Sequence, residues 1–432
     1  MNAAPALTQF RLEFAENGLV HLIFDCPGRT MNLFSNAAIE ELGTFATWLA
    51  EADVKGVLIR SGKFNAFCAG ADLTELGLAY DMVMAAPKRA RFDLAFDHFF
   101  RLGHAMRKLE TAGKPIAAVI AGIALGGGCE LAMTAHYRVL VDDPKVAMGL
   151  PESLVGLLPG AGGTQRLPRL IGIEAALPIL LDGARLSGAR ARDVGLVDMI
   201  CVAGDEVKLG EAWLLANPDA VQPWDRDDWC APMSTSVGAI IAPVRAQVLA
   251  DTLGHYPAPL AILDCIAFGA PQSFDGAIRT EMSIFSQLIQ REEARNMIQT
   301  LFLAKIEYER LKRADALPGF IGEVEAAARS ALEAIGNDSA LGAAGFSGMS
   351  ALPVRDRTCK GYWIDTPDGA QARALLNRIG APLQSLAVGL SPDQRRLADY
   401  AVVSAIGYPY YLGGPLALAA RSHALPGVQP IT

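Results

Sequence analysis

The sequence lacks the paired cysteine and histidine spacings that mark metal centres. Its seven cysteines are scattered along the chain and include no CxxC pair. Its six histidines form neither an HxxxH nor an HExxH motif. An odd, dispersed set of cysteines is typical of reduced thiols in a reducing compartment. We therefore expect no metal site.

A strong charge bias and a long apolar run are also missing. The 38 basic and 46 acidic residues give a net charge of −8, which argues against nucleic acid as the main partner. The longest apolar stretch, residues 116–125, is interrupted by Gly122 and has about half the length of a membrane span. Residues 1–10 contain no basic segment followed by an apolar core, so no signal peptide is expected. These absences predict a soluble, cytoplasmic protein without a membrane span.

Apolar residues are abundant instead. They make up 51% of the 432 residues, against 19% charged, which suggests about two or three domains. Apolar runs predict strands at 19–24, 56–60, 115–121 and 137–141. Helical spacing predicts helices at 36–51 and 89–109, and a short one from about residue 128. Strands that alternate with helices indicate an α/β architecture with crossover connections.

The second half of the chain has a different pattern. From about Pro159 onward it is mainly helical, with helices predicted at 242–253 and 285–312. Proline and glycine in residues 314–319 are typical of a boundary. The predicted organisation is a core at 1–200, a helical extension at 201–315, and a smaller, mainly helical C-terminal region at 316–432.

Two glycine-containing loops are candidates for chemistry. Residues 65–73 follow the strand that ends at Arg60, and residues 121–132 lead from a strand through Gly126-Gly127-Gly128 into a helix. Glycine lets a ligand approach the backbone, and the N-terminal N–H groups of a helix favour negative charge. This arrangement suits an oxyanion hole. The alternative is that the glycines only allow tight packing of strand on helix.

A third segment, residues 149–167, reads GLPESLVGLLPGAGGTQRL. Together with NAFCAGADL at 65–73 and AGIALGGGCELA at 121–132, it resembles the enoyl-CoA hydratase/isomerase family, or crotonase superfamily, in order and spacing. The resemblance covers about residues 10–200. It implies a spiral of ββα turns whose strands form two nearly perpendicular sheets.

The resemblance also implies how this chain handles an acyl-CoA. Carried over residue by residue, the backbone N–H groups of Ala71 and Gly127 form the oxyanion hole for the thioester carbonyl. Ala69, Asp72 and Leu73 line the path of coenzyme A. The family often has a basic residue near this path, which the sequence does not place.

Hydratases of this family carry two glutamates, and both are present as Glu130 in GGGCE and Glu152 in LPES. Hydration needs a base that activates water and an acid that protonates the carbon next to the thioester. By analogy, Glu130 deprotonates the water and Glu152 delivers the proton to C2. Taken alone, Glu130 is also explained as a complement to the helix dipole, and Glu152 as a solvated loop charge.

Other residues near these motifs are interpreted as structural. His136 lies six positions after Glu130 and so faces another side of the helix. Cys68 and Cys129 are interpreted as small buried fillers rather than nucleophiles. Residues 160–163 are rich in glycine but lack the Lys-Ser/Thr ending of a P-loop, and within the family this run is a turn.

Residues 253–259, Phe274-Asp275-Gly276, Glu281 and Phe285 narrow the resemblance to the hydratase part of multifunctional fatty-acid oxidation enzymes, where a 3-hydroxyacyl-CoA dehydrogenase follows. Here the glycine run 342–348 is not preceded by an apolar strand, and it is predicted to be a loop. Residues 398–415 resemble the end of the dehydrogenase's helical domain. The tail is therefore predicted to be a remnant that binds no NAD. Its role stays open between a packing cap on the acyl pocket and an oligomer contact.

Three functions stay open from the sequence. The first is an enoyl-CoA hydratase that converts a 2-enoyl-CoA to a 3-hydroxyacyl-CoA. The second is a delta-3, delta-2-enoyl-CoA isomerase that uses Glu152 with the same oxyanion hole. The third is a non-catalytic assembly subunit that binds acyl-CoA or a partner dehydrogenase. Retention of both glutamates favours the first, and relatives that form homo-oligomers make self-association an expectation.

Overall fold

The computed structural model describes residues 3–336, 338–346 and 367–424. The chain packs as two compact units, one made of Met1–Arg245 with Ala258–Gln290 and the other of Ala246–Pro257 with Arg291–Thr432. The domain boundaries expected near residues 200 and 315 stay predictions. None of the described helices is long and apolar enough to cross a membrane.

All strands of the described chain lie in the first unit and form two sheets. The six-stranded sheet has the order β1-β2-β3-β5-β7-β10; β1 and β2 are antiparallel, and the other neighbours are parallel. The four-stranded sheet has the order β4-β6-β8-β9, with β8 and β9 antiparallel. The strands are β1 (Phe10–Phe14), β2 (Leu19–Phe24), β3 (Gly56–Ser61), β4 (Ala66–Cys68), β5 (Ile116–Ile120), β6 (Ile123–Leu125), β7 (Tyr137–Val141), β8 (Met148–Gly149), β9 (Arg185–Leu186) and β10 (Met199–Cys201).

The chain repeats one pattern through these sheets. In each of the pairs β3/β4, β5/β6 and β7/β8, the first strand enters the large sheet and the second enters the small one, before the chain continues into helix. The apolar first strands are buried along most of their length, which is why the sequence predicts them. The predicted α/β class with ββα turns and two sheets is confirmed.

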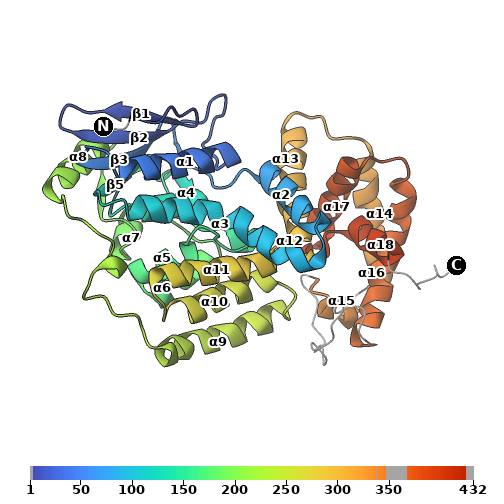
Figure 1. Cartoon of the computed structure of the whole chain (residues 1–432). Coiled ribbons are helices and arrows are strands. Elements are labelled where there is room, and N and C mark those ends of the chain that lie inside the picture. The colour runs from blue at the N-terminus through green and yellow to red at the C-terminus, as the bar shows by residue number, and fades with distance from the viewer. Residues whose placement is uncertain (1–2, 337, 347–366, 425–432) are drawn as a thin grey trace. The chain divides into compact units, whose positions relative to one another are not determined.

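Helices surround these strands in the first unit. Helix α1 begins after Ser35, whose hydroxyl accepts a hydrogen bond from the Ala38 N–H, and it buries Leu42, Phe45 and Leu49. It packs on α3, which packs on α11 (Figure 1). The helical segments are α1 (Asn36–Leu49), α2 (Leu73–Ala85), η1 (Lys88–Ala90), α3 (Arg91–Glu110), α4 (Gly127–Thr134), η2 (Glu152–Val155), α5 (Gly163–Ile171), α6 (Ile173–Leu181), α7 (Gly188–Asp193), α8 (Glu206–Ala216), η3 (Pro223–Asp225), α10 (Pro257–Gly269) and α11 (Phe274–Leu288). Helix α9 (Ser234–Thr252) contributes residues to both units.

One expectation for the second half of the chain was wrong in detail. The helix predicted at 285–312 is not continuous, because α11 ends at Leu288 and the next helix begins at Glu292. Arg291 between them has extended backbone, with φ −81° and ψ 143°, which interrupts the helical hydrogen bonds. The region after Pro159 is mainly helical, as predicted, although the short strands β9 and β10 complete the two sheets.

The secondary-structure elements described in the second unit are all helices. Its elements are α12 (Glu292–Met297), the π-helical η4 (Ile298–Ala304), α13 (Lys305–Arg313), α14 (Phe320–Ile335), α15 (Ser339–Ala343), α16 (Pro367–Leu386), α17 (Pro392–Ile406), η6 (Tyr410–Leu412) and α18 (Pro415–Ala424). The glycine run at 342–348 was predicted to be a loop. Residues 342 and 343 instead end a short helix, and 347 and 348 lie outside the described residues.

Candidate active site

The predicted site residues follow three neighbouring strands. Strands β4, β6 and β8 are parallel and adjacent in the small sheet, and Ala71, Gly127 and Glu152 come shortly after their respective ends. The carboxyl ends of parallel strands meet at one edge of a sheet, and such edges commonly carry binding sites. The fold therefore brings these three residues to one edge from three successive ββα turns.

The triple glycine forms the turn between β6 and α4. Gly126 has a φ of +55°, and a Cβ atom there would lie 2.7 Å from Oε1 of Glu152. A Cβ atom at Gly128 would overlap the carbonyl oxygen of Cys68. Gly128 is thus explained by close packing, whereas Gly126 lies directly against a carboxyl group of the predicted site.

The two predicted oxyanion donors lie close to each other. Ala71 pairs with Phe34 in an isolated parallel bridge, and a Cβ atom at Gly127 would lie 3.0 Å from the Phe34 ring. A Cβ atom at Gly70, the neighbour of Ala71, would lie 3.6 Å from the Gly127 nitrogen. In the described part of the chain, the Ala71 and Gly127 N–H groups donate to no other residue. They are therefore available to an oxygen of a ligand.

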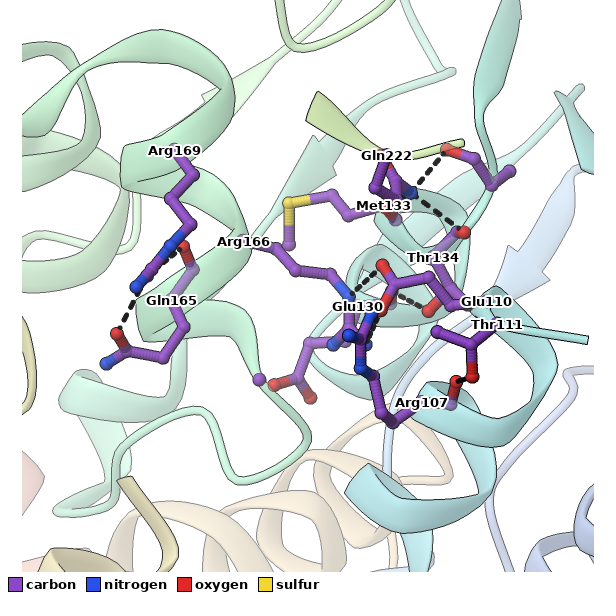
Figure 2. Close-up of polar contacts among 12 residues, drawn as sticks. Arg107, Glu110, Thr111, Glu130, Met133, Thr134, Gln165, Arg166, Arg169 and Gln222 are labelled. Carbon is purple, nitrogen blue, oxygen red and sulfur yellow. Dashed lines mark hydrogen bonds and ion pairs between the residues drawn. The ribbon is translucent and has the colours of Figure 1, made fainter. Parts of the chain in front are cut away.

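Glu130 lies in the first turn of α4 and is 2% exposed. Its Oε1 atom accepts hydrogen bonds from the N–H groups of Ala161 and Gly163, both at 2.8 Å. Gln222 fixes the other end of α4, because its amide donates to the carbonyl oxygens of Met133 and Thr134 (Figure 2). A buried carboxyl that binds another loop is more than a complement to the helix dipole.

Glu152 begins η2, after the buried strand β8 and Pro151. Part of the residue is exposed, but its Oε2 atom is buried and has no hydrogen-bond partner among the described residues. A buried carboxyl oxygen without a partner is costly unless it is protonated or meets a ligand. The interpretation of Glu152 as a solvated loop charge is therefore wrong.

The two carboxyl groups affect each other's titration. Burial raises the pKa of Glu130, against the opposite effect of the Ala161 and Gly163 N–H groups and of the Arg166 charge. Burial, followed by the charge of Glu130, raises the pKa of Glu152 well above its ordinary value. Glu130 is stabilised as a carboxylate by these donors, whereas Glu152 lacks comparable partners. The arrangement favours a single proton shared by the pair and held mainly by Glu152.

A buried ion-pair network supports the loop that binds Glu130. Arg166 has no exposed side-chain surface, and it contacts both carboxylate oxygens of Glu110 at 3.0 Å. It also donates to the carbonyl oxygen of Ala161 at 2.7 Å. Arg107 reaches Glu110 from the other side, at 3.0 Å, and Figure 2 shows these contacts as dashed lines. The arginines thereby fix the backbone whose N–H groups hold Glu130.

A third buried glutamate, Glu281 on α11, joins this site although the sequence analysis assigned it no role. It is 1% exposed and accepts hydrogen bonds from the Gly162 N–H at 2.7 Å and the Thr164 N–H at 2.9 Å. Burial, followed by the charge of Glu130, raises the pKa of Glu281 to about 8. Its partners, two backbone N–H groups and the Thr164 hydroxyl, lie far away in sequence and so leave no local motif.

The residues predicted to line the coenzyme A path lie at the start of α2. Ala69 and Leu73 are partly exposed, as a lining role requires. Asp72 is 5% exposed, and its carboxylate caps α2 by accepting from the Thr74 N–H at 3.0 Å. Its other oxygen lies 2.7 Å from Arg29, whose side chain is 49% exposed. The structure thus gives Asp72 a helix-capping role and places a basic residue, missing from the sequence interpretation, beside it.

Asp72→Ala is expected to destabilise the fold by about 1 kcal/mol, because the first turn of α2 loses its capping acceptor. Asp72→Asn keeps a capping oxygen and should retain most of this stability. Urea unfolding followed by circular dichroism measures both changes. Equal losses for the alanine and asparagine variants would assign the effect to the pair with Arg29 rather than to the cap.

The residues interpreted as structural are in environments that suit that role. His136 accepts from the Ile116 N–H at 3.0 Å, and burial lowers its pKa to about 4. Cys68 and Cys129 are fully buried, and burial raises the pKa of both thiols, that of Cys68 to about 12. A thiol with a raised pKa is a weak nucleophile. Over the described residues, no group of His, Cys, Asp and Glu is arranged to hold a metal ion.

Comparison with known proteins gives one family. Residues 15–222 match the family model described as enoyl-CoA hydratase/isomerase. The fatty acid oxidation complex subunit alpha of Shewanella frigidimarina (strain NCIMB 400) is 33% identical over 306 residues, which cover 70% of this chain and 41% of that protein. The protein of the same name from Shewanella loihica (strain ATCC BAA-1088 / PV-4) is 35% identical over 320 residues, which cover 73% of this chain and 44% of that protein. The chain spans about two fifths of the length of these relatives.

Solved structures are also similar in part. A putative enoyl-CoA hydratase from Streptomyces avermitilis is 20% identical, with a TM-score of 0.46 over 68% of this chain and 92% of that chain. An enoyl-CoA hydratase from Bacillus halodurans is 18% identical, with a TM-score of 0.47, and the match covers 68% of this chain and 99% of that chain.

Proposed function

Because the chain belongs to the enoyl-CoA hydratase/isomerase family through its residues 15–222, we propose that it adds water to a 2-enoyl-CoA to give a 3-hydroxyacyl-CoA. The observation that carries this proposal is the pair of buried carboxyl groups, Glu130 and Glu152, at the edge where the Ala71 and Gly127 N–H groups lie. Hydration uses two acid–base groups, whereas moving a double bond uses one proton shuttle.

The reaction follows from the positions of these groups. The thioester oxygen accepts hydrogen bonds from the Ala71 and Gly127 N–H groups, which stabilise it as it gains negative charge. Glu130 takes a proton from water as the water oxygen bonds to C3. Glu152 gives its proton to C2, and the thioester carbonyl re-forms. One water is consumed. Glu130 then passes the proton that it gained to Glu152, which restores the starting protonation of both carboxyl groups.

The test is an assay in heavy-oxygen water with a 2-enoyl-CoA and, separately, a 3-enoyl-CoA. A hydratase converts the 2-enoyl-CoA to a 3-hydroxyacyl-CoA that carries one heavy oxygen, which mass spectrometry detects. An isomerase converts the 3-enoyl-CoA to the 2-enoyl-CoA without incorporating heavy oxygen. Heavy-oxygen incorporation supports our proposal. Isomerisation alone, or no turnover with either substrate, contradicts it and favours the isomerase or the assembly subunit.

We also propose that the chain binds no NAD and does not oxidise the product of hydration. A dinucleotide site needs a strand, a glycine turn and a helix, followed by an acidic residue that binds the ribose. The described residues of the second unit form helices and no strand, which supports the proposal. The acidic residue for the ribose is expected about 20 positions after the glycine turn, and Asp365 is the nearest fit after the run at 342–348. It lies outside the described residues.

Calorimetric titration of this chain with NAD is therefore expected to give no heat of binding. Addition of NAD and a 3-hydroxyacyl-CoA should give no absorbance from NADH. A mixture with a purified 3-hydroxyacyl-CoA dehydrogenase is the positive control, because it produces NADH under the same conditions. Stoichiometric binding of NAD to this chain alone would make it bifunctional. The relatives are named as subunits of complexes, and we propose a separate partner for the oxidation step.

A further inference from the structure

Residues Ala161 to Thr164 present four consecutive N–H groups that are divided between two glutamates. The N–H groups of Ala161 and Gly163 donate to Oε1 of Glu130, both at 2.8 Å. Those of Gly162 and Thr164 donate to Oε1 and Oε2 of Glu281, at 2.7 and 2.9 Å. Alternate N–H groups of one turn therefore bind a carboxyl group on each side of it.

Within the described part of the chain, both carboxyl oxygens of Glu281 accept hydrogen bonds, whereas only one oxygen of Glu130 does. The Thr164 hydroxyl lies 2.5 Å from Oε2 of Glu281, so both Glu281 oxygens have partners. Gln165 continues the network, because its amide donates to Thr164 Oγ1 at 2.9 Å and to the Cys265 carbonyl oxygen at 2.8 Å. By contrast, Oε2 of Glu130 has no hydrogen-bond partner among the described residues. That oxygen is the one left for a water molecule.

We infer that Glu281 is a positioning residue, which holds the turn at residues 161–164 and through it sets the place of the Glu130 carboxylate. The inference rests on the proposed function, in which Glu130 activates water. Glu281 does not contact the substrate in this account. Without Glu281 the turn would lose its bonds at Gly162 and Thr164 and keep those of Glu130 and of Arg166 at the Ala161 carbonyl oxygen, so Glu130 could move together with its two donors. A displacement of a catalytic group by about 1 Å is enough to lower a rate about 100-fold.

The chemistry of the carboxyl group explains why glutamate, and not glutamine, suits this position. Each oxygen of Glu281 accepts from one backbone N–H, so both oxygens must offer a lone pair. A carboxylate does so, and a protonated carboxyl also does so while it donates its proton to the Thr164 hydroxyl. The pKa of about 8, raised first by burial, is compatible with either form. A glutamine has one accepting oxygen and an NH2 group, which would face an N–H donor.

The experiment compares Glu281→Gln with Ser286→Ala. Ser286 lies on the same helix, is buried, and donates to the Met282 carbonyl oxygen; among the described residues it makes no hydrogen bond to residues 161–164. Glu281→Gln should lower kcat for hydration about 100-fold and leave KM near its original value. The reason is that a displaced Glu130 carboxylate stabilises the transition state less, whereas it is not proposed to bind the substrate. Ser286→Ala should keep kcat within about twofold, since it removes no group that contacts the turn. A normal kcat in a folded Glu281→Gln protein overturns the inference.

A second measurement does not depend on activity. Hydrogen exchange at single-residue resolution reports the protection of the four amides of the turn. In Glu281→Gln the amides of Ala161 and Gly163, which bind Glu130, should exchange faster although Glu281 does not contact them. Faster exchange confined to Gly162 and Thr164 would show that the two sides of the turn are independent, and the inference would then be wrong.

Exchange also separates failure of this inference from failure of the proposed function. If the unaltered chain hydrates no 2-enoyl-CoA, the proposed function fails, and exchange alone decides whether Glu281 positions Glu130. If Glu281→Gln does not fold, Glu281→Asp takes its place. Aspartate keeps both accepting oxygens but places them one methylene further from the turn. It should lower kcat at unchanged KM and speed exchange at Ala161 and Gly163, and unchanged values of both would overturn the inference.

Discussion

Glu152→Gln and Glu130→Gln are each expected to lower the rate of hydration by at least about 100-fold and to leave acyl-CoA binding nearly intact. Glutamine at position 152 cannot donate the proton that C2 needs. Glutamine at position 130 cannot take a proton from water. The rate loss should appear in kcat, because neither side chain is proposed to bind the coenzyme A part of the substrate.

The hydrogen bonds of Glu130 make its glutamine variant a clean test. Both N–H donors, those of Ala161 and Gly163, bind the same oxygen, Oε1. A glutamine can place its one carbonyl oxygen there and keep both bonds. The fold of the turn should therefore survive, in contrast to Glu281→Gln, where two accepting oxygens are needed.

Steady-state kinetics with a 2-enoyl-CoA and calorimetric binding of an acyl-CoA measure the two parts of this prediction. Glu16→Gln serves as the matched control, because Glu16 is an exposed glutamate between β1 and β2. It should leave kcat and KM unchanged. Near-normal turnover in the Glu130 or Glu152 variant would remove that residue from the assigned role.

Gly127→Pro is expected to lower transition-state stabilisation by roughly 2.7–4 kcal/mol, since proline removes one N–H donor of the proposed oxyanion hole. Gly127 is the first residue of α4, where the N–H has no partner within the helix. Proline is favoured at this helix position, so the helix itself should tolerate the change. The loss should therefore be catalytic rather than structural.

Gly127→Ala is the control, because it keeps the N–H group. Its Cβ atom would lie 3.0 Å from Cδ2 of Phe34, so a small shift of that ring should suffice. We expect the alanine variant to lose much less activity than the proline variant. Measurement of kcat/KM, with circular dichroism as a check of folding, decides the point. A folded proline variant with the activity of the alanine variant would place the oxyanion hole elsewhere.

The sequence predicted elements that carry a long periodic signal and missed those that do not. The strand expected at 137–141 is β7 with the same bounds, because its side chains are nearly all buried and apolar. Strand β1 was missed because only Phe10 among its five residues is buried, as befits a strand at the sheet edge. Strands β6 and β8 have three and two residues, which is too short for any periodicity to appear.

The candidate site shows the same division. Glu130 and Glu152 were identified because they lie in compact motifs, whereas their burial depends on residues distant in sequence. Glu281 was quoted only as part of a resemblance, since its bonds to the Gly162 and Thr164 N–H groups require no particular side chain on the loop. Arg29 was not identified as the basic residue near the predicted coenzyme A path for a related reason. Its partner, Asp72, is far away in sequence, and only the fold brings the two side chains together.

The residues of the proposed site follow three adjacent strands, so the spacing of these strands sets the width of that site. Neighbouring strands are spaced by about 4.8 Å, so the edge formed by β4, β6 and β8 is about 10 Å wide. That width matches the conjugated thioester with one water, and not the whole of a long acyl chain. In the proposed reaction, this edge would therefore contact only the functional group of the substrate. Under the same proposal, selectivity for chain length comes from other residues, and changing it should leave the chemistry of this edge untouched.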